Sequence, residues 1–229
     1  EGRKVGCQSW QTTANVWVRG IMQEHYDLDL TEVEWYRRKE DDVPVDIPEK
    51  FDIRTIPGPQ GGEAIVEPND FREMFFSGEL VAAMDPAGSF FHDVLESEDA
   101  ELFFENPIEE ERAYYEETGI HPIMHTVAIR DEILEEHPWV AVNLFDAYCE
   151  SRDRCLDANR SPSTNTSITW AHLHLDDQRE VLGEDAWEFG LTDRTTREVE
   201  KFVEYATDQG LAPRAYDPAE LFADVSVAR

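Results

Sequence analysis

The fold is decided at the start of the chain, where residues 3–25 read RKVGCQSWQTTANVWVRGIMQEH. The first five of these residues form a short run typical of a buried strand. Residues 14–25 have the spacing of a helix, with Thr12 or Thr13 as the N-cap. The stretch therefore predicts a strand, a polar turn and a helix in succession.

The same alternation continues along the next sixty residues. The sequence predicts strands at residues 33–37 and 80–84 and, between them, a helix at residues 70–77 that ends at Gly78. Residues 39–62 are charged and then rich in Pro and Gly, which favours a surface excursion. Strand, helix, strand, helix, strand in this order is typical of an α/β fold with a parallel sheet flanked by helices.

The rest of the chain has a mostly helical pattern. The elements expected here are a helix at 107–118, a strand at 123–130, helices over 131–159 interrupted at 137–138, and helices at 175–183, 195–210 and 218–223. A short segment fixed by Pro122 separates the two patterns at residues 119–122. We place a lobe boundary there, so that residues 1–118 form one lobe and residues 119–229 form a hinge and part of another.

The composition excludes several partners. The chain has 51 Asp plus Glu against 20 Lys plus Arg, a net charge of −31. This charge repels nucleic acid and disfavours an anionic membrane surface, while 41% hydrophobic and 11% aromatic residues argue against disorder. The acid excess indicates a halophilic, haloarchaeal-type protein, because salt screens its self-repulsion. An acidic mesophilic protein is the alternative.

The cysteines and the chain start bear on the compartment. Cys7, Cys149 and Cys155 include no CxxC pair and predict neither a disulfide framework nor a zinc site. No apolar run reaches membrane-spanning length, and residues 1–4 have no signal-peptide apolar region. We therefore expect a cytoplasmic protein without membrane insertion. The chain opens without Met and enters a strand at once, which indicates that an upstream segment is absent.

The turn after the first strand carries five polar side chains: Gln8, Ser9, Gln11, Thr12 and Thr13. In an open α/β sheet, ligands lie at the carboxyl ends of the strands and face helix N-termini, whose N–H groups bind anions. The turn has neither the dinucleotide glycine pattern nor the P-loop pattern. It is a candidate cradle for a carboxylate, and ordinary helix capping is the alternative.

Three further residues are candidates for chemistry. Asp85 follows the strand at 80–84, so it lies at the same sheet edge and could accept a hydrogen bond from a substrate hydroxyl. His121 and His125 share one face if their segment is a strand, and His125 is then a candidate general acid or base. The alternatives are a turn aspartate for Asp85 and structural roles beside a hinge for both histidines.

His172 and His174 resemble half a metal site, which Asp176 and Asp177 could complete. No Cys or third His lies near them in the sequence. We therefore predict no metal and no cofactor. The expected partner is a small aromatic or aliphatic carboxylate, and a homo-oligomer is left open.

Several motifs along the chain carry a resemblance. They read QTTANVWVRGIMQ at 11–23, SGELVAAM at 77–84, YYEETGIHPIMHTVAIR at 114–130, HPWV at 137–140, GEDAWEFG at 183–190 and PAELFA at 218–223. Together they resemble the 4,5-dihydroxyphthalate decarboxylase family. The run GIHPIMHT is the most distinctive of these matches.

The resemblance implies a two-lobed fold like that of type II periplasmic binding proteins, with residues 1–118 as the second lobe. The first lobe is then incomplete, because family members carry a preceding N-terminal segment. It also implies removal of carbon dioxide from 4,5-dihydroxyphthalate to give protocatechuate. On this interpretation His125 donates the proton, Asp85 contacts a ring hydroxyl, and the turn residues and His121 bind the substrate. The rival is a non-catalytic substrate-binding protein of an ABC-type importer for a small carboxylic acid, since that fold serves such receptors.

Overall fold

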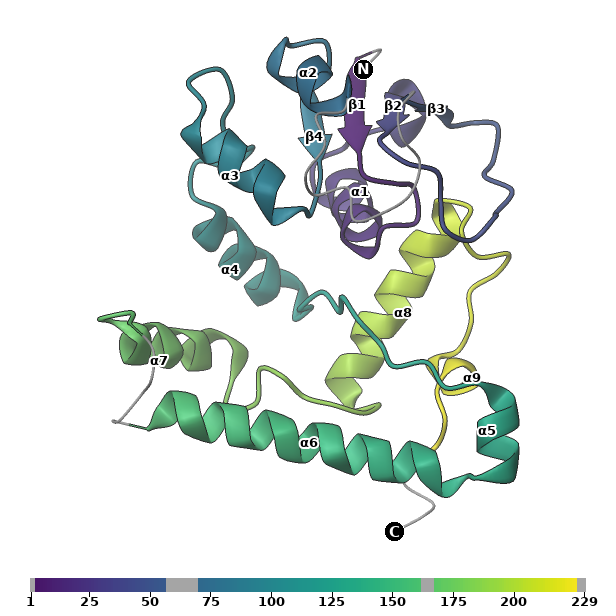
Figure 1. Cartoon of the computed structure of the whole chain (residues 1–229), viewed down its shortest axis with the longest axis vertical. Helices are drawn as coiled ribbons and strands as arrows, with labels where there is room; N and C mark the ends of the chain where they lie inside the picture. The colour runs from purple at the N-terminus through teal and green to yellow at the C-terminus, as the bar shows by residue number, and fades with distance from the viewer. Residues whose placement is uncertain (1–2, 57–69, 162–166, 226–229) are drawn as a thin grey trace. The chain divides into compact units, whose positions relative to one another are not determined.

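The structure is a computed structural model that describes residues 3–56, 70–161 and 167–225, in two compact units (Figure 1). Unit 1 comprises Glu1–Glu105 and Lys201–Ala215, and unit 2 comprises Asn106–Glu200 and Tyr216–Arg229. The division thus falls before α4 (Pro107–Thr118), whereas the sequence places a lobe boundary after it. The assignment of residues 1–118 and 119–229 to two lobes stays a prediction.

A late segment of the chain belongs to unit 1 because its aromatic side chains pack on α1 (Thr13–His25). The rings of Phe202 and Tyr205 lie 5.5 and 5.7 Å from the ring of Trp17, between centroids. Both residues are on α8 (Asp193–Asp208), whose first part belongs to unit 2. Sequence order alone gives no sign of this return.

Unit 1 is built on a parallel sheet of four strands (Figure 1). They are β1 (Lys4–Cys7), β2 (Glu34–Arg37), β3 (Asp52–Thr55) and β4 (Ala82–Met84), in the order β3-β2-β1-β4. Val5 of β1 pairs with Trp35 on one side and with Ala82 on the other. The predicted α/β class with a parallel sheet flanked by helices is therefore confirmed.

Three elements of unit 1 were missing from the sequence prediction, of which the shortest is the 3-10 helix at Leu30–Glu32. β3 lies inside the segment predicted to be a surface excursion, and it is an edge strand in which Ile53 packs on the core while Asp52 and Arg54 are exposed. Four residues with one apolar side chain give too short a pattern to recognise. The third element is α3 (Gly88–Glu96), which buries Phe90 and Val94 at helical spacing.

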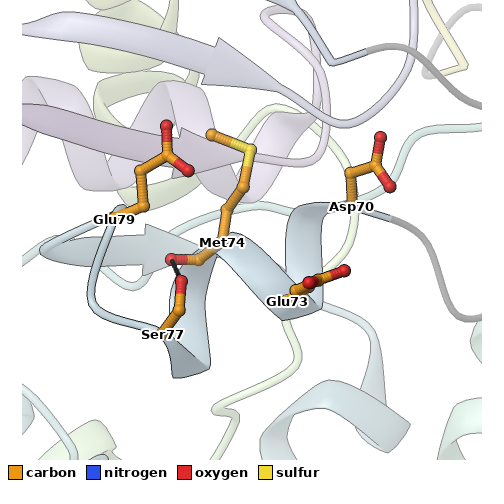
Figure 2. Close-up of a pocket in the computed structure, with 5 residues that line it drawn as sticks. All are labelled: Asp70, Glu73, Met74, Ser77 and Glu79. Carbon is orange, nitrogen blue, oxygen red and sulfur yellow. Dashed lines mark hydrogen bonds between the residues drawn. The ribbon is translucent and has the colours of Figure 1, made fainter.

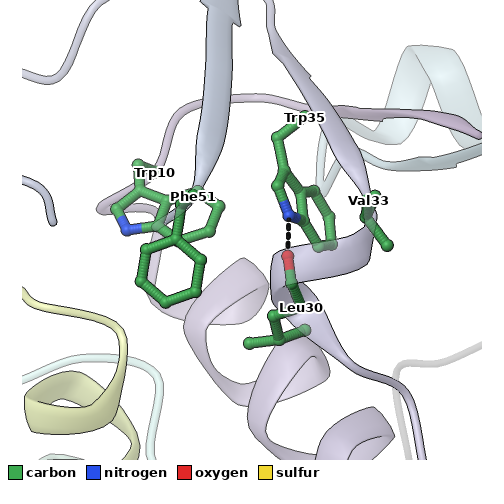
Figure 3. Packing of buried hydrophobic residues seen from close by; sticks show 5 residues of the cluster. All are labelled: Trp10, Leu30, Val33, Trp35 and Phe51. Carbon is green, nitrogen blue, oxygen red and sulfur yellow. Dashed lines mark hydrogen bonds between the residues drawn. The ribbon is translucent and has the colours of Figure 1, made fainter. Parts of the chain in front are cut away.

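Besides the packing of α8 on α1, two apolar clusters contribute to the core of unit 1. Their residues include Leu30 of the 3-10 helix η1 (Leu30–Glu32) and Phe71 of α2 (Asp70–Phe76). One cluster contains Trp10, Leu30, Val33, Trp35 and Phe51 (Figure 3). The other contains Ile56, Phe71, Leu80, Phe90 and Val94. The indole of Trp35 donates to the Leu30 carbonyl at 2.9 Å, so the burial of this polar group leaves no hydrogen bond unmade.

Unit 2 is helical in the residues that the structure describes. Its helices are α4, α5 (Asp131–Glu136), α6 (Trp139–Arg160), α7 (Ala171–Leu182), the first part of α8, and α9 (Pro218–Leu221). Gly119, at φ 65°, ends α4 in the left-handed conformation that favours glycine. The side chains of Trp139, Trp170 and Trp187 are more than half exposed.

The strand predicted at residues 123–130 is wrong. This segment forms no strand, because each strand that the structure describes belongs to unit 1 and the segment has no partner strand to bond with. The alternation of apolar residues in this segment is typical of a strand, but the segment does not pair with one. Among the described helices, none is both long enough and apolar enough to cross a bilayer.

Candidate functional site

The carboxyl ends of β1, β2 and β4 meet at one edge of the unit 1 sheet, joined by backbone hydrogen bonds beyond the strands. Gln8 N donates to Met84 O at 3.2 Å, Arg38 N to Cys7 O at 2.8 Å, and Lys39 N to Gln8 O at 3.1 Å. The predicted turn, the cationic residues that follow β2, and Asp85 are therefore neighbours. This edge is where an open α/β sheet receives its ligand.

The hydroxyls of the turn bond to one another and leave the helix end uncapped. Ser9 Oγ and Thr12 Oγ1 lie 2.8 Å apart, and Thr12 Oγ1 donates to Gln8 Oε1 at 3.1 Å. Thr12 is the N-cap of α1, as predicted, but its side chain makes no capping hydrogen bond in the described structure. The first turn of the helix, which starts at Thr13, contains no acidic residue. The first turn of α1 therefore supplies no carboxylate of its own to the positive end of the helix dipole.

Gln11 bonds to the loop that follows β2, so its polar groups do not line an empty binding site. Its backbone N–H donates to Asp41 Oδ1 at 2.7 Å, and its side-chain amide bonds both backbone groups of Val43. The second oxygen of Asp41 accepts from Arg37 Nη1 at 2.7 Å. The turn therefore already binds one carboxylate, that of Asp41, and the Gln11 N–H is engaged within the chain.

Asp85 and Arg38 form a buried pair at this edge. Asp85 Oδ1 accepts from Ala87 N at 2.9 Å, and Asp85 Oδ2 lies 3.4 Å from Arg38 Nη1. Their side chains are 0% and 6% exposed, respectively. Burial raises the pKa of Asp85, against the opposing effects of the Ala87 N–H and the Arg38 charge.

Arg38 is not among the residues predicted from the sequence. The available signal was the run Arg37-Arg38-Lys39, three successive cations at a strand end in a chain of net charge −31. Arg37 pairs with Glu40 and Asp41, and Lys39 with Asp42. The pairing of Arg38 with a residue 47 positions away depends on strand order, which sequence spacing does not give.

His121 and His125 belong to unit 2, whereas the edge just described belongs to unit 1. The His121 backbone N–H donates to Glu198 Oε1 at 3.1 Å, and its ring stands edge-on to Trp187 at 5.6 Å between centroids. Burial lowers the pKa of His121. His125 is exposed in the segment without strand pairing, so the shared strand face predicted for the two histidines is absent.

The described residues contain no cluster of three or more His, Cys, Asp or Glu side chains arranged to hold a metal ion. His172 and His174 both lie on α7. At this spacing of two residues, helical side chains point to different faces, so the two do not converge on one ion.

An open hollow of about 310 Å³ lies beside α2 (Figure 2). Its lining residues are Asp70, Glu73, Met74, Ser77 and Glu79. Three of the five are carboxylates, which repel an anionic ligand. Glu79 also bonds Lys4 at 2.6 Å, at the amino end of β1, and therefore at the opposite end of the strand from the candidate edge.

Comparison with known proteins gives one informative relative, and no family model matches the chain. The relative is a protein of Comamonas testosteroni named 4,5-dihydroxyphthalate decarboxylase. It is 26% identical over 230 residues, which cover 99% of this chain and 68% of the relative. The similarity thus extends over both units.

Proposed function

We propose that this chain removes carbon dioxide from 4,5-dihydroxyphthalate, or from a similar aromatic carboxylate, and releases protocatechuate. One observation carries the proposal: the similarity to a protein with that name extends along 99% of the chain. With it we propose the two-lobed fold of type II periplasmic binding proteins. The carboxyl edge of the sheet supports the choice of substrate class, because its turn binds a carboxylate already.

The reaction needs proton transfers and no oxidant or reductant. A proton adds to the ring carbon that bears the carboxylate, while the para hydroxyl loses its proton and becomes ketone-like. The carbon–carbon bond then breaks and carbon dioxide leaves. The electron pair of that bond restores the aromatic ring, and the oxygen regains a proton. The protein must therefore supply an acid at the ring carbon and a hydrogen-bond acceptor at the hydroxyl.

We assign these roles to His125 and Asp85. Asp85 is suited to accept from a hydroxyl because burial raises its pKa, so a proton shared with it is held more readily than by an exposed aspartate. Its side chain is fully covered, so this contact requires its covering groups to move aside. We assign carboxylate binding to the turn at Gln8, Ser9, Gln11, Thr12 and Thr13, and substrate contact to His121.

The test is incubation of the full chain with 4,5-dihydroxyphthalate in concentrated potassium chloride, with carbon dioxide and protocatechuate measured together. Phthalate, which lacks both hydroxyls, is the matched control and is expected to bind without reacting. We expect Asp85→Asn to lower turnover by about 100-fold. Binding of both acids without any product would contradict the proposal and favour the importer-type binding protein.

A further inference from the structure

Arg19 of α1 is a buried cation that contacts no carboxylate among the residues that the structure describes. The residue is 0% exposed. Its Nε donates to Gln209 Oε1 at 2.8 Å and its Nη2 donates to Trp10 O at 2.5 Å, while Nη1 has no hydrogen-bond partner in the described part of the chain. The guanidinium carbon lies 3.8 Å from the centre of the Trp10 ring. Burial lowers the pKa of Arg19 to about 10.

Burial of such a charged group lowers the stability of the folded chain. A buried charge without a counter-ion is destabilising, and neutral side chains can donate the same hydrogen bonds. The carboxylate of Asp41 attracts the charge at a distance, but its oxygens bond Gln11 and Arg37. The positive charge of Arg19 therefore needs an explanation beyond its hydrogen bonds.

The location of the guanidinium supplies one. A long side chain on a helix runs back toward the helix N-terminus, and the bond to Trp10 O places this guanidinium at the turn between β1 and α1. The same turn precedes the uncapped N-terminus of α1, a helix of 13 residues. Two sources of positive potential, the helix dipole and Arg19, thus act at one turn, where the carboxylate of Asp41 accepts from Gln11 N.

Arg19 also fixes the shape of this turn through Gln209. The Trp10 indole donates to Gln209 O at 3.0 Å, and Gln209 Nε2 donates to Val16 O at 2.9 Å. Every partner in this network is at most 1% exposed or is a backbone atom of a buried residue. The turn is therefore held in one conformation before any ligand arrives, which lowers the entropic cost of binding.

We propose that Arg19 is a positioning residue that holds the turn at residues 8–13 for a substrate carboxylate and provides the buried positive charge such a group requires. This inference rests on the proposed function for its substrate class. Arg19 does not touch the ligand. It acts through the conformation of the turn and through the electrostatic field of its own charge.

The experiment measures phthalate binding to the full chain by calorimetry, at a fixed potassium chloride concentration. Arg19→Met removes the charge, and Arg19→Lys keeps it. Gln209→Glu leaves Arg19 in place and adds a carboxylate next to its Nε. Arg54→Met is the matched control, because Arg54 is half exposed on β3 and pairs with Asp52 and Glu34.

We expect the Kd for phthalate to rise about tenfold or more in Arg19→Met and to stay within about threefold of the native value in Arg54→Met. Arg19→Lys should fall between the two, because it keeps the charge but not both bonds to Gln209 and Trp10. Gln209→Glu is expected to weaken binding by at least about threefold, and it decides the matter if Arg19→Met does not fold. Native affinity in a folded Arg19→Met, or in Gln209→Glu, would overturn the inference.

The same samples are assayed for product from 4,5-dihydroxyphthalate, which separates the two proposals. Phthalate binding that depends on Arg19 without any product leaves this inference standing and refutes the decarboxylase. If product forms, and phthalate binding is unchanged in the Arg19 and Gln209 variants, this inference is refuted and the decarboxylase proposal is not. A native chain that neither binds nor reacts refutes both.

Discussion

Replacing Arg38 by glutamine leaves Asp85 as an unpaired buried carboxylate at the sheet edge. At the observed 3.4 Å, an effective dielectric constant of about 20 gives an attraction of about 5 kcal/mol between the two charges. Removal of one partner from such pairs costs about 3–5 kcal/mol of unfolding free energy. We therefore expect Arg38→Gln to destabilise unit 1 strongly at pH 7.

Protonation of Asp85 limits that loss and gives it a pH dependence. From the ordinary pKa of 3.8, protonation at pH 7 costs about 4 kcal/mol, and at pH 5 about 1.6 kcal/mol. The pKa of Asp85 is raised in the folded chain and rises further without Arg38. Asp85 therefore contributes to the free energy of unfolding at low pH. This contribution is lost as the pH rises from the pKa of Asp85 in the unfolded chain through its pKa in the folded chain. The deficit of the variant should be smaller at pH 5 than at pH 7.

Urea unfolding followed by tryptophan fluorescence measures this effect. Trp10, Trp17 and Trp35 are buried in unit 1 and report on it. The double variant Arg38→Gln with Asp85→Asn replaces the ion pair by a neutral pair. It is expected to recover all but about 1.5 kcal/mol of the native free energy of unfolding. A loss below about 1 kcal/mol at pH 7, or an equal loss at both pH values, would refute the reasoning.

Three other substitutions or reactions test separate parts of the structure. Gly20→Ala is expected to lower the free energy of unfolding by about 1–3 kcal/mol, because the added Cβ would overlap the ring of Tyr205 on α8. Gly88→Ala, with open space around it, is the control and should stay within about 0.5 kcal/mol of the native value in urea unfolding. The Cys7 thiol, whose pKa burial raises to about 11, should resist Ellman's reagent at pH 8 until the chain unfolds, while exposed Cys155 reacts at once. His125→Gln should lower turnover by about 100-fold, and unchanged turnover would remove its assigned role.

The sequence predicted the elements that have strong local patterns. β1, α1, β2 and β4 lie close to their expected positions, and the parallel sheet follows from their alternation. β3 was missed because an edge strand of four residues buries little. The strand predicted at 123–130 failed for the reverse reason, since alternation without a partner strand cannot form a sheet.

The candidate site was predictable only as a location. The turn and Asp85 were found because the carboxyl ends of parallel strands share an edge. The contacts that decide the chemistry join residues far apart in the chain, such as Arg38 with Asp85 and Arg19 with Gln209, 47 and 190 positions apart. Such pairs follow from strand order and from the return of residues 201–215 to unit 1.

The most direct test of the central claim is the reaction of 4,5-dihydroxyphthalate in deuterium oxide, with the product analysed by mass spectrometry and proton NMR. Protonation of the ring carbon predicts protocatechuate that carries deuterium at the position vacated by the carboxylate, formed in equal amount to carbon dioxide. Absence of product, or product with hydrogen at that position, would contradict the proposed chemistry.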